Sequence, residues 1–163
     1  MPGPKVKLER TKATKFAYVE HVGAYGSIPV GSIIPRLYEY SKRHGLRPGF
    51  FPMGVFHDSP VHTPPEKCRS EIGIAVSGKA EPEGDIKVRK LPASRVAAIS
   101  HKGPSSDYQK TYHALGEWIS SHGYEWAGPA IEVYTKRPVQ DGGETILFAR
   151  IKAPVKKRKA AVK

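Results

Sequence analysis

Two glutamates, Glu71 and Glu144, are the candidates for chemistry in this sequence. Each opens a strand-like run, over residues 71–74 and 144–147. A carboxylate in an aromatic-lined cleft would attract a cationic or electron-poor ligand, with cation–π contacts adding to the charge attraction. Desolvation would instead raise the pKa of such a carboxylate and let it act as a general acid or base. Taken alone, either residue is better explained as a solvated surface acid, because acids that open strands are common on protein surfaces.

Three aromatic residues of the second half complete the predicted site. Tyr112, Trp118 and Tyr134 fall on segments expected to face inward or to flank a cleft. Tyrosine and tryptophan commonly line pockets for flat organic ligands, because they combine an apolar body with a polar group. The alternative is that these side chains simply belong to the core. The predicted ligand-binding set is Glu71, Glu144, Tyr112, Trp118 and Tyr134, and the two glutamates would be the catalytic pair if the protein is an enzyme.

Other chemistries find little support, and we expect neither a cofactor nor a metal. The loop with His57, His62 and Cys68 has a tolerable His-x4-His spacing for zinc, but it is stiffened by prolines and offers no evident fourth ligand. Cys68 has no obvious base partner, which argues against a cysteine nucleophile. Phosphate-binding glycine loops and hydrolase or metalloprotease motifs are missing from the sequence.

The net charge of +12 is concentrated at the two ends of the chain. Residues 1–15 hold five Lys/Arg and one Glu, residues 156–163 hold five Lys/Arg and no acid, and residues 16–155 therefore carry only +3. Like-charged tails of this kind are usually solvated, and they contact nucleic acid weakly if at all. No apolar run is long enough to span a membrane. A single cysteine, Cys68, fits a reducing cytoplasm.

The chain repeats one pattern twice. Each half has three motifs in the same order. The first is a strand-like run ending in His-x-Gly, at His21 and His101. The second is a helix-like stretch closed by His-Gly, at His44 and His122, and the third is a strand opened by Glu, at Glu71 and Glu144. The offsets between the copies are 80, 78 and 73 residues. This pattern predicts a duplicated β-α-β-β unit, with a cleft where the two units join and the two glutamates at equivalent places beside it.

The predicted organisation follows from these repeats. Residues 1–15 are expected to be a flexible basic segment, 16–153 a single domain with repeats at about 16–78 and 86–152, and 154–163 a basic disordered tail. Helices are predicted from Ser32, a good N-cap residue, to Gly45, and from a capping box at Ser106 to Gly123. Both helices would cover one face of a mostly antiparallel sheet, which gives an α+β fold with pseudo-twofold symmetry.

Several motifs, in order, resemble those of the GyrI-like effector-binding family, found in gyrase-inhibitory proteins and in BmrR-type and Rob-type transcription regulators. They span roughly residues 14–153 and are the segments 21–26, 58–60, 64–71, 118–124 and 128–134 together with Glu144. The resemblance implies two β-α-β-β units with a ligand cleft between them. It also implies that Glu144 is the carboxylate that meets cationic drugs, with Tyr112, Trp118 and Tyr134 as walls. The proline commonly seen in the last strand of the family does not occur within residues 144–151.

Three functions follow from this resemblance. The first is a small-molecule binding protein that senses or sequesters hydrophobic, often cationic compounds, although the sequence shows no DNA-binding helix-turn-helix. The second is a hydrolase of cyclopropanoid, electrophilic natural products, in which Glu71 and Glu144 would activate water. The third is a gyrase-inhibitor-like protein-interaction module, in which the protein surface or the basic ends would matter more than the cleft.

Overall fold

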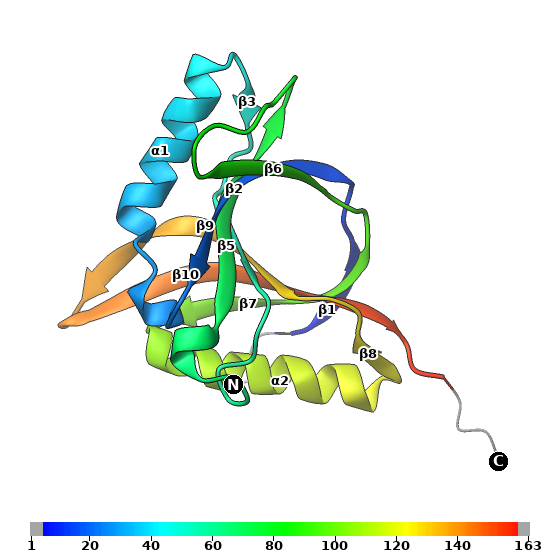
Figure 1. Cartoon of the computed structure of the whole chain (residues 1–163). Helices are drawn as coiled ribbons and strands as arrows, with labels where there is room; N and C mark the ends of the chain where they lie inside the picture. The colour runs from blue at the N-terminus through cyan, green and yellow to red at the C-terminus, as the bar shows by residue number, and fades with distance from the viewer. Residues whose placement is uncertain (1–4, 160–163) are drawn as a thin grey trace.

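The computed structural model describes residues 5–159, which form two similar halves (Figure 1). The first half has β2 (Thr14–Val22), α1 (Val30–Arg43), β4 (Met53–Phe56) and β5 (Arg69–Ser77). The second has β7 (Arg95–Gly103), α2 (Tyr108–Ser121), β9 (Ala130–Asp141) and β10 (Glu144–Lys157). The remaining strands are β1 (Lys7–Arg10), β3 (Arg47–Pro48), β6 (Ile86–Leu91) and β8 (Tyr124–Trp126), and short 3-10 turns lie at Tyr25–Ser27, Pro65–Lys67 and Ser105–Asp107. The predicted α+β duplication is confirmed.

Both helices begin at residues other than those predicted. α1 starts at Val30, so Pro35 lies inside the helix and one backbone hydrogen bond near its N-terminal end is not made. α2 starts at Tyr108, and neither helix receives a hydrogen bond from a capping side chain. The predicted capping box at Ser106 is therefore wrong, because residues 105–107 form a 3-10 turn that leads into α2 instead.

The strands form one sheet in the order β1-β7-β10-β9-β4-β5-β2-β6, with β3 added to β5 and β8 to β10. All pairings between the described strands are antiparallel. The halves meet where β4 pairs with β9, with Gly54 opposite Glu132, Met53 opposite Val133 and Val55 opposite Ile131. Residue 53 is separated from 131 by the same offset as residue 55 from 133. Exchanging the two halves therefore turns the pair Met53–Val133 into the pair Ile131–Val55, and the pseudo-twofold axis passes between Gly54 and Glu132.

The two edge strands are exchanged between the halves. β1 precedes β2 in the chain but pairs with β7, and β6 precedes β7 but pairs with β2. Links of only three residues, 11–13 and 92–94, join these strands and reach no more than about 14 Å. The sheet must therefore curl until its ends approach, which produces the ring in Figure 1. Where the links cross, Thr11 N donates to Ser94 O at 2.8 Å and Ser94 N donates to Thr11 Oγ1 at 3.0 Å.

The helices lie outside this ring, and each covers its own half (Figure 1). Leu37 and Tyr40 of α1 pack on β2 and β5, and Leu115 and Ile119 of α2 pack on β7 and β10. Because successive residues of a strand point to opposite faces, the alternate positions line the inside of the curl. The apolar cluster there is centred on Phe16, Tyr18 and Val55 and packed by Met53, Leu91 and Ile131.

The ends of the described chain are part of the fold, which corrects the predicted domain boundaries. Residues 7–10 form β1 rather than a flexible segment, and β10 continues to Lys157 through its pairing with β8. Arg158 then donates a backbone hydrogen bond to Gly123 O at 2.8 Å and a guanidinium hydrogen bond to Ser120 O at 2.6 Å. The rest of the predicted tail, residues 160–163, lies outside the described residues. Within residues 5–159, neither helix has the length and apolar character that crossing a bilayer requires.

Candidate functional site

The candidate site is centred on Glu132, in β9 at the join between the halves. Its side chain belongs to a residue that is only 6% exposed. Tyr112, from α2, donates its hydroxyl hydrogen bond to Glu132 Oε2 at 2.5 Å, and Tyr134 donates to Oε1 at 3.2 Å. Both carboxylate oxygens are thus held by tyrosines, one from the helix and one from the same strand. We call Glu132, Tyr108, Tyr112 and Tyr134 the Glu132 site.

Gly54 makes room for this arrangement. It faces Glu132 across the β4–β9 pair. A Cβ atom at position 54 would lie 2.8 Å from the Tyr134 hydroxyl and 2.7 Å from Phe56 Cε2. These separations are shorter than side chains tolerate, so a larger residue would displace the tyrosine that contacts Glu132. The close approach of Tyr134 and Phe56 therefore depends on a glycine here.

Burial sets the electrostatics of the Glu132 site. It raises the pKa of the Glu132 carboxyl, and hydrogen bonds from Tyr112, Tyr134 and Tyr108 offset part of that rise. Burial, together with the nearby Glu132 carboxylate, raises the pKa of the three tyrosines, so they act as neutral donors. Among the described residues, Glu132 makes no ion pair with Lys, Arg or His. Buried carboxylates are normally paired, so this one has capacity for a cation.

Histidine holds the α2 side of the Glu132 site in position. The ring of His101, from the second His-x-Gly motif, stacks on Tyr108 with centroids 4.3 Å apart. Its Nδ1 lies 2.7 Å from Thr111 Oγ1, and its Nε2 lies 3.3 Å from Pro104 O. A carbonyl can only accept, so Nε2 carries the proton and the Thr111 hydroxyl can donate to Nδ1. The motif thereby orients the start of α2, whose first two turns carry Tyr108 and Tyr112.

Glu71 lies on the opposite face of the sheet, inside the curl. Its neighbours Ile72 and Ile74 pack under α1, and alternation places Glu71 on the other side. Its carboxylate pairs with Arg89 of β6 and lies 3.4 Å from His57 Nε2. Glu71 is 8% exposed, and its pairing with Arg89 ties the exchanged strand β6 to β5. The structure therefore does not bring Glu71 together with the aromatic residues predicted to share its site.

Glu144 lies at the exposed end of the β9–β10 hairpin, opposite Asp141. The predicted equivalence of Glu71 and Glu144 is wrong. His21 pairs with Ser70 and His101 pairs with Ala149, so the residue equivalent to Glu71 is Arg150. The offset of 73 residues between Glu71 and Glu144 is shorter than the offsets of 80 and 78 between the other repeated motifs. It is shorter because Glu144 is not the residue of the last strand that corresponds to Glu71.

The predicted aromatic residues divide in the same way. Tyr112 and Tyr134 contact Glu132, whereas Trp118 lies at the C-terminal end of α2. There its ring stacks on His122 with centroids 4.0 Å apart and lies parallel to Tyr124 at 6.1 Å. Trp118 is thus part of the packing between α2 and β8.

The sequence analysis missed Glu132 although a signal was present. Residues 130–134 alternate Ala, Ile, Glu, Val and Tyr, which puts Glu132 on the same strand face as Ala130 and Tyr134. An acidic residue on the core-facing side of a strand is unusual and marks a candidate site.

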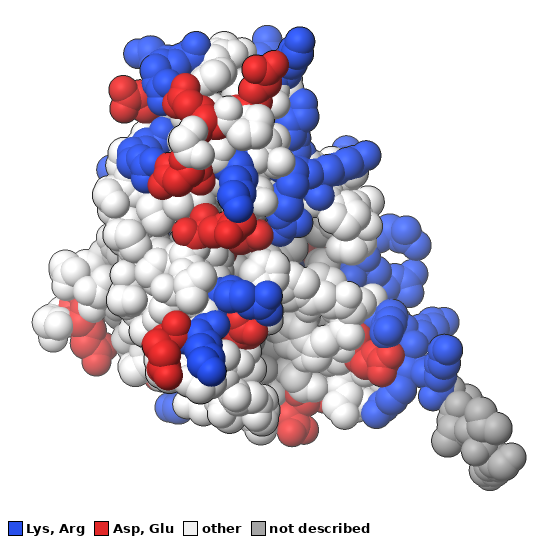
Figure 2. Space-filling view, viewed as in Figure 1, with Lys and Arg blue, Asp and Glu red and all other residues white. Residues whose placement is uncertain are grey.

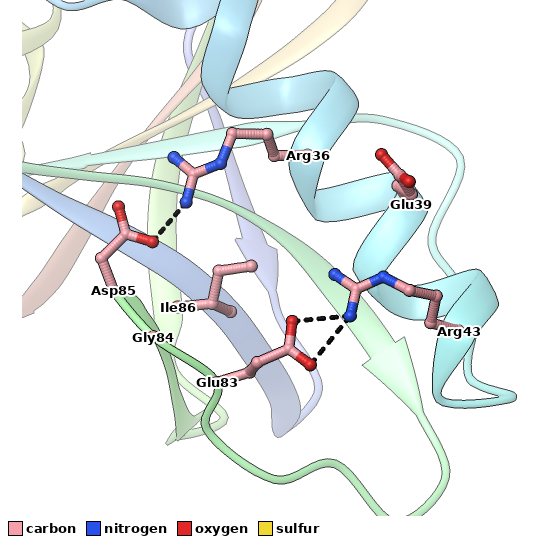
Figure 3. A pocket seen from close by; sticks show the side chains of 7 residues that line it. All are labelled: Arg36, Glu39, Arg43, Glu83, Gly84, Asp85 and Ile86. Atoms are coloured by element: carbon pink, nitrogen blue, oxygen red, sulfur yellow. Dashed lines mark hydrogen bonds and ion pairs between the residues drawn. The ribbon is translucent and has the colours of Figure 1, made fainter.

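A cavity of about 370 Å³ lies elsewhere, between α1 and the segment before β6 (Figure 3). Ion pairs cross it, from Arg36 to Asp85 and from Arg43 to Glu83 at 2.8 Å. These charges are largely exposed and already paired. The cavity is therefore a bridged surface groove, separate from the Glu132 site.

Comparison with known proteins gives a family and its fold. The model of the GyrI-like small molecule binding domain matches residues 4–156. A curated relative, the SPbeta prophage-derived putative transcriptional regulator YosT of Bacillus subtilis (strain 168), is 22% identical over 138 residues, covering 84% of this chain and 93% of YosT.

Three solved structures share the fold. The EcmrR C-terminal domain superposes with a TM-score of 0.78 at 22% identity, covering 94% of this chain and 98% of that domain. In a complex of EcmrR with DNA, the match covers 58% of the EcmrR chain. SAV2435 bound to tetraphenylphosphonium has a TM-score of 0.57 at 12% identity, covering 93% of this chain and 94% of that one. With a family model matching nearly the whole described fold, this chain belongs to the GyrI-like family of small-molecule binding domains.

Proposed function

We propose that this protein binds hydrophobic organic cations at the Glu132 site. The observation that carries the proposal is a buried carboxylate whose described partners are all neutral tyrosine hydroxyls. A cation placed there would gain a charge interaction in a region screened from water, where such interactions are strongest. The SAV2435 structure, with its bound tetraphenylphosphonium, supports this class of ligand.

The surrounding aromatic side chains suit a bulky cation. Tyr108 and Tyr112 come from α2 and Tyr134 from β9, and Phe56 of β4 approaches from the other half. Aromatic faces attract cations through their quadrupoles and offer apolar area at the same time. The residues that we assign to ligand binding are therefore Glu132, Tyr108, Tyr112 and Tyr134.

Binding requires the site to open. Both oxygens of Glu132 already accept tyrosine hydrogen bonds, and the residue is 6% exposed. We infer that a ligand displaces at least one tyrosine, most simply Tyr112, because α2 presents it from outside the sheet. Tyr112→Phe removes the hydroxyl without changing the ring, so it should keep the apolar contacts while leaving the carboxylate less restrained.

Isothermal titration with tetraphenylphosphonium tests the proposal. Replacing Glu132 with Gln should weaken binding by about 30-fold or more, equivalent to ~2 kcal/mol for the loss of one member of a buried charge pair. Glu144→Gln is the matched control, since it removes the same charge from an exposed hairpin end, and it should bind like the parent protein. Equal affinity of the parent and Glu132→Gln proteins would refute the proposal, provided that both show the same cooperative thermal unfolding.

A second candidate function is hydrolysis of an electrophilic ligand. The raised pKa of Glu132 favours it, because general acid–base catalysis needs a group that titrates nearer to neutrality than an ordinary carboxyl. Incubation with a panel of reactive cyclopropane compounds, followed by mass spectrometry, tests it. A gain of one water that depends on Glu132 would show an enzyme, and recovery of every compound unchanged would leave binding as the function.

A further inference from the structure

Five basic residues surround the crossing of the two short links. Arg10 and Lys15 flank the first link, Lys90 and Arg95 flank the second, and Lys12 lies within the first. We call these five residues the crossover patch. All but Arg95, which is half-buried, are exposed. Figure 2 shows Lys and Arg prevailing over Asp and Glu on the right-hand side, where the links run in Figure 1.

Like charges face each other within the crossover patch. Arg10 is the register partner of Arg95 in the β1–β7 pair, and Lys15 is the register partner of Lys90 in the β2–β6 pair. Like charges directly opposite each other destabilise a sheet. The arrangement also occurs twice, because the 80-residue offset between His21 and His101 also relates Arg10 to Lys90 and Lys15 to Arg95. Folding alone gives no reason for it.

Acidic side chains do not neutralise the crossover patch. Segments 10–15 and 90–95 contain no Asp or Glu. Among the ion pairs between described residues, none involves a member of the crossover patch. Lys15 donates to a neutral group, the Gly78 carbonyl. The patch therefore presents its positive charge to an outside partner.

The crossover patch is held in a fixed geometry. Glu9 and Phe16 point into the curl, so alternation puts their neighbours Arg10 and Lys15 on its outer surface. The hydrogen bonds between Thr11 and Ser94 fix the two links to each other. Positions 10 and 15 are at most about 17 Å apart. That span corresponds to about five nucleotide steps of 3.4 Å.

A small cavity adjoins the patch. It has a volume of about 230 Å³ and no acidic residue in its lining, where the polar side chains are those of Lys15, Arg47, Thr14 and Ser77. Lysine, arginine, hydroxyl and backbone N–H groups are the ones that contact phosphate oxygens in protein–nucleic-acid complexes. The cavity thus extends the basic surface with the same chemistry.

We propose that the crossover patch binds the phosphate backbone of nucleic acid. The Thr14 hydroxyl lies among the positive charges, and hydroxyls are among the groups that contact phosphate oxygens. A membrane surface fits less well, because segments 10–15 and 90–95 contain none of the aromatic residues that anchor proteins at lipid interfaces. Contacts to phosphate alone carry no sequence information, so the binding is independent of sequence.

Fluorescence anisotropy with a labelled 20-base-pair duplex, titrated at several salt concentrations, tests the proposal. About four phosphate contacts give a slope near −3.6 for log K against log salt, or a loss of roughly 150-fold between 50 and 200 mM salt. The variant Arg10→Gln, Lys12→Gln, Lys90→Gln, Arg95→Gln should lose most of the affinity at 50 mM salt and flatten the slope. Its circular dichroism and thermal unfolding verify the fold.

Two further variants make the test specific. A control variant removes the same charge from other exposed positions by changing Lys42, Lys67, Lys102 and Lys136 to Gln. It should retain the affinity of the parent protein and its slope of log K against log salt. Changing Lys156, Lys157, Arg158 and Lys159 to Gln tests the C-terminal basic run. The proposal fails if the control or the C-terminal variant loses as much affinity as the patch variant, or if the parent protein binds anionic phosphatidylserine vesicles but not the duplex at 50 mM salt.

Discussion

The two halves of this molecule share one backbone plan and differ in where charge is placed on it. At the join, the position occupied by Glu132 in the second half is occupied by Gly54 in the first. Inside the curl, Glu71 pairs with Arg89 in the first half, whereas the equivalent pair in the second half, Arg150 with Glu9, has the signs reversed. The fold thus accepts the acidic and the basic residue in either order in the ion pair that ties an edge strand to the sheet. At the pseudo-twofold axis there is room for only one buried carboxylate, that of Glu132, because the residue paired with it, Gly54, must be a glycine.

The largest expected effect separates the two equivalent ion pairs. Glu71→Ala removes a carboxylate whose side chain is only 11% accessible and which faces both Arg89 and His57, and it should lower the free energy of unfolding by about 3 kcal/mol. Glu9→Ala removes a more exposed partner, with 36% of its side chain accessible, and should cost about 1 kcal/mol. Urea denaturation of both variants measures the difference. Equal losses would show that the halves depend on their ion pairs to the same extent.

Gly54→Ala tests the asymmetry at the axis. The added methyl group would clash with the Tyr134 hydroxyl and the Phe56 ring, so we expect a loss of about 2 kcal/mol in stability. Tetraphenylphosphonium binding should weaken as well, because Tyr134 shifts away from Glu132. Gly116→Ala is a matched control, since a Cβ there meets no atom within 4 Å, and the helical position should gain slightly from alanine. Unchanged stability of Gly54→Ala would contradict the proposed role of the glycine.

The pH dependence of binding sharpens the role of Glu132. Burial raises the pKa of its carboxyl above the ordinary value of 4.5, and only the ionised form attracts a cation. Affinity for tetraphenylphosphonium should therefore fall, by about tenfold or more, as the pH is lowered through the raised pKa, and Glu132→Gln should show no such fall. The sign for stability is opposite. The folded state favours the neutral carboxyl, so ionising Glu132 lowers the free energy of unfolding. This cost is absent below pH 4.5 and complete above the raised pKa. Denaturation of the parent and Glu132→Gln proteins over this pH range measures the cost.

The smallest effect concerns how each helix is anchored at its C-terminal end. Arg158 donates to the Ser120 carbonyl at the end of α2, while Arg43 at the end of α1 pairs with Glu83 across an exposed groove. Arg158→Ala should cost about 1 kcal/mol, as expected for one hydrogen bond from a charged donor. Arg43→Ala should cost about half as much, since exposed ion pairs contribute little. Thermal unfolding distinguishes the two, and a larger loss for Arg43→Ala would reverse the ranking.

The sequence predicted the frame better than the site, for a physical reason. The His-x-Gly turns and the glycines that end the helices are local signals. Gly45 and Gly123, for example, both adopt positive φ. The offsets between the two copies of these motifs predict the duplication. The site depends on register across distant strands, which no local signal fixes. Tyr112 and Tyr134 stand out in the sequence as aromatic residues, whereas the pairing of Glu132 with Gly54 cannot be seen in either strand alone. The basic ends of the chain likewise have the composition of solvated tails, because the pairing of β1 with β7 leaves no trace in either segment alone.

The exchanged edge strands also set the order in which the protein can assemble. Lys7 pairs with Ala98, so β1 must wait until β7 has been synthesised, about 90 residues later in the chain, before it meets its neighbour. Until then its open edge and that of the unfinished sheet are available to other chains. Pairing between residues so distant in sequence is slow. The crossing of two three-residue links therefore makes the halves a single cooperative unit, in which neither half is complete until the other has been made.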